Sequence, residues 1–164
     1  MDSYRKRRGW SDKFLPEIRK IVGEFLIDEP PVNEDELRNT DLMVLGMEAV
    51  RVACRVRTHV KYLEYPNDFT IRAWVDSGNK TELTKILEGW GDYLFYGFAD
   101  ESNEKLIHWK IIDLKVFRLW FVRCLLRNAG EPPGELAPNI DGKSKLRAFS
   151  VLDVPKVVVK EWTA

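Results

Sequence analysis

The chain has 164 residues, of which 45% are hydrophobic and 32% charged, so it is long enough for one domain and too apolar for a disordered chain. Lys and Arg number 26, as do Asp and Glu, so bulk charge does not indicate a nucleic-acid partner. Cys54 and Cys124 lie in apolar segments with no Cys-x-x-Cys spacing, which argues against structural zinc and fits two buried thiols in a reducing cytoplasm. No apolar run approaches the roughly 20 residues that span a bilayer, so we expect a cytoplasmic protein with no membrane partner.

The amino-terminal part combines a basic arm with one helix. Residues 1–10 are the basic arm. Apolar residues recur at helical spacing from Phe14 to Leu26, which predicts an amphipathic helix with Pro16 in its first turn. Residues 33–40 are polar and read as a helical turn or a loop.

Three strands are predicted next. The first is the short apolar run 42–45. In 50–57, apolar and basic positions alternate with period two, which is typical of a half-buried strand. The basic face carries Arg51, Ala53, Arg55 and Arg57, and the other face carries Val50, Val52, Cys54 and Val56. The third strand is 69–75, in which Thr70, Arg72 and Trp74 share one face, and a turn follows at 76–79.

The remaining segments alternate between helices and strands. Thr81 is the predicted N-cap of a helix with an apolar stripe of Leu83, Ile86, Leu87 and Trp90. Residues 93–98 are apolar on both faces, which predicts an interior strand, and 106–112 is another strand. Further along the chain we expect a helix capped by Asp113, a long loop at 129–144, a strand at 146–152 and a tail at 157–162. The predicted fold class is α/β (α+β), a central mixed sheet flanked by helices in one domain, 1–164.

Basic residues on the predicted sheet are the candidates for nucleic-acid binding. Arg51, Arg55 and Arg57 would form a row of at most about 20 Å, and Arg72 extends it if the strands pair. Guanidinium groups match the geometry of phosphate, and Lys80 adds a cation where the helix at 81 begins. The alternative is an ordinary solvated face paired with acidic neighbours.

Several of these segments resemble a known group of proteins. The stretch FTIRAWVDSGNKTELTKILEGWGDYLFYGFAD, together with IIDLKVFR, TDLMVL and VACRVR, is similar to a group of small bacteriophage and prophage proteins whose activity is not established. The resemblance covers a little over half of the chain and implies a phage protein.

A looser resemblance is to the restriction-endonuclease-like, or PD-(D/E)XK, fold, whose element order matches 14–98. That resemblance implies a Mg²⁺ ion held by an Asp on one strand and an acid two residues before a Lys on the next. Asp41 corresponds to the first acid, but the expected acid positions hold Arg55 or Thr70. A metal site would then need Glu82 as second ligand, with Asp76 and Glu48 as other candidates. Lys85 or Arg72 would steady the phosphate.

Three functions therefore stay open from the sequence. The first is a nucleic-acid-associated or anti-defence phage protein that works without catalysis through the arginine face. The second is a divergent Mg²⁺-dependent nuclease with Asp41, Glu82 and Lys85 in its active site. The third is a protein-interaction module that binds a host protein.

Overall fold

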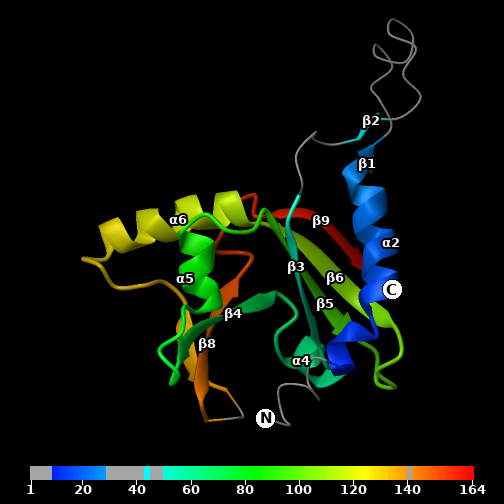
Figure 1. Cartoon of the computed structure of the whole chain (residues 1–164), viewed down its shortest axis with the longest axis horizontal. Coiled ribbons are helices and arrows are strands. Elements are labelled where there is room, and N and C mark those ends of the chain that lie inside the picture. Colours follow the sequence, from blue (N-terminus) through cyan, green and yellow to red (C-terminus); the bar gives the residue numbers. More distant parts are fainter. Residues whose placement is uncertain (1–8, 29–42, 45–49, 140–141) are drawn as a thin grey trace, which may run out of the picture. The chain divides into compact units, whose positions relative to one another are not determined.

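The computed structural model of the protein (Figure 1) describes residues 9–28, 43–44, 50–139 and 142–164. Two compact units are present, residues 1–50 and residues 51–164. None of the helices in the described ranges is long and apolar enough to cross a membrane.

The first unit contains the predicted amphipathic helix. Helix α2 spans Leu15–Leu26, with Pro16 in its first turn as expected. Phe14 and Ile18 are buried, which confirms the apolar face at this end. A two-stranded antiparallel sheet, β1 (Ile27–Asp28) with β2 (Met43–Val44), follows the helix. Of the basic arm predicted for 1–10, residues 1–8 lie outside the described residues, and residues 9 and 10 are helical instead of belonging to an arm. The segment 33–40 and the candidate ligands Asp41 and Glu48 also lie outside the described residues.

The second unit is built on two sheets. The four-stranded main sheet has the order β3-β5-β6-β9, in which β3 and β5 are parallel and the other pairs are antiparallel. The three-stranded sheet has the order β4-β8-β7 and is antiparallel. The main strands are β3 (Val52–Arg57), β5 (Tyr93–Ala99), β6 (Leu106–Asp113) and β9 (Val158–Thr163), and the others are β4 (Asp68–Val75), β7 (Glu135–Pro138) and β8 (Ser144–Ser150). The helices are α4 (His59–Glu64), α5 (Glu82–Leu87) and α6 (Leu114–Arg127).

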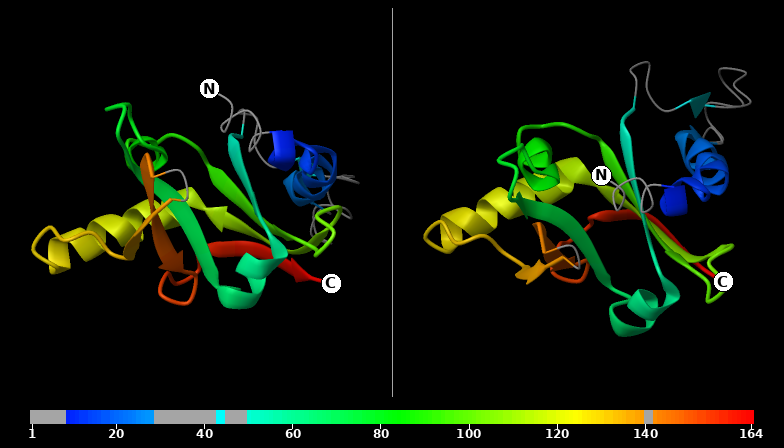
Figure 2. Two further views of the ribbon diagram at one scale, coloured as in Figure 1. Left: turned by 90° about the horizontal axis from the view of Figure 1, so that it is seen from below. Right: turned by 60° about the horizontal axis from the view of Figure 1, so that its bottom comes forward.

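This arrangement confirms the predicted fold class. The main sheet is mixed, and β5 lies in its interior between β3 and β6, as the apolar character of 93–98 on both faces predicts. Helix α5 packs on β4 and α6, and Figure 2 shows β4 and β8 side by side next to α6. The aromatic core joins Phe69 of β4, Phe149 of β8 and Phe117 of α6, whose ring centroids lie 4.9–5.6 Å apart.

Both predicted helix caps are confirmed. The Thr81 side chain accepts a hydrogen bond from the Thr84 N–H and begins α5. The Asp113 carboxylate accepts from two backbone N–H groups of the first turn of α6. Both contacts satisfy N–H groups that have no partner inside the helix.

Three elements differ from the sequence predictions: one short helix, and two strands that long-range pairing creates. Helix α4 was not predicted, since its six residues bury no side chain and show no helical stripe. Strand β7 lies inside the predicted loop 129–144 and exists through its pairing with β8. The predicted tail 157–162 is largely β9, the strand that pairs with β6 at one edge of the main sheet.

Three side chains point elsewhere than the periodicity predicts. Trp90 is 60% exposed, because α5 ends at Leu87 and Trp90 follows it instead of continuing its apolar stripe. Cys54 is exposed, although it was expected to be a buried thiol on the apolar face of β3. A bulge in β4 between Arg72 and Trp74 pairs Trp74 with Lys145, which turns the Trp74 ring away from the face of Arg72.

Candidate functional site

One face of the main sheet carries two rows of side chains that are polar except for Phe98. Residues in register on neighbouring strands lie side by side on the same face. The first row reads Arg55, Tyr96, Lys110 and Glu161, and the second reads Arg57, Phe98, His108 and Thr163. His108 and Lys110 stand two residues apart in the otherwise apolar strand β6 (LIHWKIID), and this spacing is the sequence signal that they share one face.

The first polar site, here called the arginine cluster, comprises Arg55, Arg57, Thr70, Arg72, Glu82 and Tyr96. Arg55 enters it from β3 and donates through Nη1 to the backbone oxygen of Thr70 at 2.9 Å. Arg57 donates through Nε to the Tyr96 hydroxyl at 3.1 Å and through Nη2 to the Thr70 hydroxyl. The two hydroxyl oxygens lie 3.2 Å apart, so Thr70 and Tyr96 join the arginines of β3 into one network.

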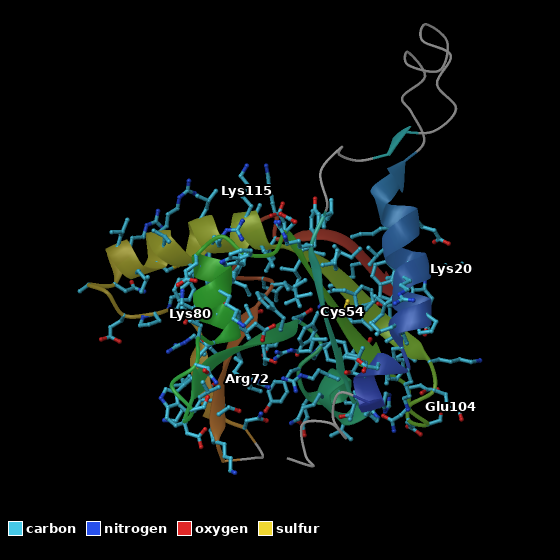
Figure 3. The ribbon with its side chains drawn as sticks, viewed as in Figure 1. Lys20, Cys54, Arg72, Lys80, Glu104 and Lys115 are labelled. Carbon is cyan, nitrogen blue, oxygen red and sulfur yellow. The ribbon has the colours of Figure 1, made fainter. Side chains whose placement is uncertain are left out.

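Glu82 is the carboxylate of this cluster. It forms an ion pair with Arg55 and accepts a hydrogen bond from the backbone N–H of Arg72 at 3.1 Å. The first turn of α5 places Glu82 over β4, since Thr81 caps the helix beside that strand. Figure 3 labels Arg72 on β4, below α5 in that view. The Arg72 Nε is buried and has no hydrogen-bond partner within the described residues.

The arginine cluster is electrostatically unbalanced. It contains three guanidinium groups and one carboxylate, so the residues that form it carry a net charge of +2. Burial lowers the pKa of Arg55, Glu82 opposes that shift, and Arg57 and Arg72 add to it by repulsion. The Arg55 and Glu82 side chains keep 18% and 27% of their exposure, so solvent reaches the cluster.

Three of the five residues predicted to bind nucleic acid meet in this cluster, namely Arg55, Arg57 and Arg72. They are half-buried, whereas the alternation in β3 predicted a solvent-facing row. The reason is that β4 and α5 cover this face of β3 and supply polar partners for it. Arg51 lies apart and exposed, with its guanidinium 5.8 Å from the ring centre of Trp90. Lys80 is exposed and paired with Glu88 at 2.6 Å.

The nuclease residues are only partly within the described structure. Glu82 is engaged by Arg55, and Lys85 is exposed on α5. Asp41 lies outside the described residues, so its distance from Glu82 is not defined. In the described ranges, no group of three or more His, Cys, Asp or Glu side chains is arranged to hold a metal ion.

A second polar site lies between β6 and β9. Lys110 is 1% exposed and donates through Nζ to the Pro66 backbone oxygen at 2.5 Å, with Glu161 at 3.4 Å. The Nδ1 atom of His108 lies 2.7 Å from the Thr163 hydroxyl, and its Nε2 lies 3.2 Å from Glu161 outside hydrogen-bonding geometry. Burial lowers the pKa of both His108 and Lys110. Lys110 has its partners, and both side chains contact residues of β9, so this site serves the attachment of β9.

Comparison with known proteins adds no relative. No family model matches the chain, and no curated protein and no solved structure shows significant similarity to it.

Proposed function

We propose that this protein is a non-catalytic nucleic-acid-binding protein whose arginine cluster holds a phosphate group of the nucleic-acid backbone. The proposal agrees with the nucleic-acid-associated role considered for a phage protein from the sequence. The observation that carries it is the gathering of three arginines, Arg55, Arg57 and Arg72, in one cluster whose single carboxylate, that of Glu82, pairs with Arg55.

The charge imbalance supports an anionic ligand. Partly buried cations are costly unless they are paired, and groups of like charge within a few ångströms repel one another. One carboxylate offsets one of the three positive charges in the cluster. A phosphate diester supplies one further negative charge and a terminal phosphate about two, so either reduces the excess.

The available donors also suit a phosphate group. Guanidinium groups present paired N–H donors that match two phosphate oxygens, and the buried Arg72 Nε is a donor without a partner in the described residues. The hydroxyl groups of Thr70 and Tyr96 lie beside Arg57 and can rotate toward a bound oxygen. Partial exposure of the cluster leaves a route for a ligand from one side.

The nuclease hypothesis lacks a comparable observation. Glu82 is neutralised by Arg55, and a carboxylate held by a guanidinium group is a poor ligand for Mg²⁺. An assay for cleavage with Mg²⁺ and Mn²⁺, on wild type and on Asp41→Asn, tests that alternative directly.

Salt-dependent binding of oligonucleotides tests the proposed function. We expect the affinity of the wild type for single- or double-stranded DNA or RNA to fall as the salt concentration rises. The double variant Arg57→Gln with Arg72→Gln should reduce the slope of log K against log salt concentration by about 1. Lys160 is an exposed cation on β9, so Lys160→Gln is the matched control and should leave the affinity and the slope unchanged.

Two further measurements separate charge from folding. Arg72→Lys keeps the positive charge but loses the paired N–H donors of the guanidinium group. This variant should therefore retain the salt dependence of the wild type while its affinity for the oligonucleotide falls. Circular dichroism of each variant reports whether the fold survives. Absence of wild-type binding at low salt, or equal slopes in wild type and in a folded double variant, would refute the proposal.

A further inference from the structure

The outward face of α6 combines exposed apolar side chains with exposed cations. Leu119, Val122 and Leu126 are 54%, 47% and 80% exposed, although each is a residue type that normally avoids water. Their spacing of three and four residues places them in one stripe along the helix. Figure 3 shows side chains, including that of Lys115, projecting from the side of α6 away from α5.

Cations border this stripe on the same helix. Lys115, Arg123 and Arg127 are exposed, and none of them forms an ion pair within the described part of the chain. Helix α6, which the structure describes completely, contains no Asp or Glu. Since exposed helices usually mix both signs of charge, a face of one sign around an apolar stripe is a feature that needs a partner.

We infer that this face of α6 docks an acidic amphipathic helix of another protein. An apolar stripe on that partner would cover Leu119, Val122 and Leu126, and its flanking carboxylates would pair with Arg123 and Arg127. The 14 residues of α6 extend over about 21 Å, which matches a partner helix of three to four turns.

Other occupants fit this face less well. A second copy of α6 would bring like charges together, which costs free energy at an interface. A nucleic-acid backbone would satisfy the cations but would place phosphates against three apolar side chains. The protein partner therefore accounts for both the charges and the apolar stripe. This inference goes beyond the proposed function, because no residue of the arginine cluster belongs to α6.

A pair of synthetic peptides tests the inference with the full-length chain. One peptide is an amphipathic helix with Leu on one face and Glu on the flanks, and the other carries Lys in place of every Glu. Anisotropy of labelled peptide should show binding of the Glu peptide and at least about tenfold weaker binding of the Lys peptide.

Variants of α6 assign the binding to this face. Arg123→Glu with Arg127→Glu should reverse the preference in favour of the Lys peptide, an exchange that mere loss of structure would not produce. Leu119→Ser with Leu126→Ser should weaken the binding of the Glu peptide about tenfold or more through lost apolar contact. Leu152→Ser is the matched control, since Leu152 is 75% exposed and lies outside α6.

Three outcomes would overturn the inference. The first is equal binding of the two peptides, and the second is unchanged binding by the α6 variants. The third is that neither peptide binds, whereas single-stranded DNA or vesicles of phosphatidylglycerol bind and the double substitution Leu119→Ser with Leu126→Ser abolishes that binding. Loss of oligonucleotide binding in the Arg57 and Arg72 variants would not affect this result, so the two proposals fail independently.

Discussion

Replacement of Glu82 by Gln is the most direct probe of the arginine cluster. The substitution keeps the size of the side chain and leaves an amide oxygen to accept the backbone N–H of Arg72, which donates to Glu82 at 3.1 Å. It removes the negative charge that pairs with Arg55 and leaves three guanidinium groups without a carboxylate in the cluster.

The expected destabilisation follows from the exposure of the pair. Exposed ion pairs contribute about 0–1 kcal/mol, whereas removal of one member of a buried pair costs about 3–5 kcal/mol. At 18% and 27% side-chain exposure the Arg55–Glu82 pair lies between these limits, and the retained hydrogen bond reduces the loss. We expect E82Q to lower the free energy of unfolding by about 2 kcal/mol at low salt.

Urea denaturation measures this change, and phosphate in the buffer provides a second readout. If the cluster binds phosphate, loss of the Glu82 carboxylate should raise the affinity of the cluster for phosphate. Stabilisation of the native state by phosphate should then be larger in E82Q than in wild type, because it grows with the logarithm of the affinity. Glu88→Gln, at the C-cap of α5, is the control, and it removes an exposed pair with Lys80 at a cost of at most about 0.5 kcal/mol.

A clear result would refute this reasoning. If the free energy of unfolding of E82Q lies within about 0.5 kcal/mol of the wild-type value, the Glu82 carboxylate does not offset the arginine charges as described. If phosphate fails to stabilise either protein, the cluster does not hold this anion.

Three further substitutions test other parts of the structure. Burial, and to a lesser extent the charge of Lys110, lowers the pKa of His108, so the unfolded chain binds a proton at this histidine more readily than the native protein does. The free energy of unfolding should therefore fall as the pH decreases from about 7.5 to 5.5, and urea denaturation across this range should show a smaller fall for His108→Gln. Gly134 has a φ of +82° and an added Cβ would lie 2.3 Å from the backbone oxygen of Ala148, so Gly134→Ala should cost about 2 kcal/mol or more in urea unfolding. Asp113→Ala removes the N-cap of α6 and should lower stability by about 1 kcal/mol in the same assay, with Asp113→Asn nearly neutral.

Local patterns in the sequence determined most of the elements. Helical spacing after Phe14, the caps Thr81 and Asp113, and the apolar residues 93–98 each depend on neighbours within a few positions. The interior position of β5 was therefore predictable, because a strand that is apolar on both faces must be covered on both. Arg55, Arg57 and Arg72 could also be recognised as a group from their parity along two strands.

Only the tertiary structure decided what those arginines face. The alternation in β3 assigns Arg55 and Arg57 to one side of the strand, but period two does not say whether that side meets water or another layer. Residues 13 to 27 positions away, Thr70 and Glu82, supply their partners. Likewise, β9 exists because its hydrogen bonds go to β6, some 50 residues earlier in the chain. Periodicity is a property of neighbouring residues, whereas burial and strand pairing depend on which distant segments meet.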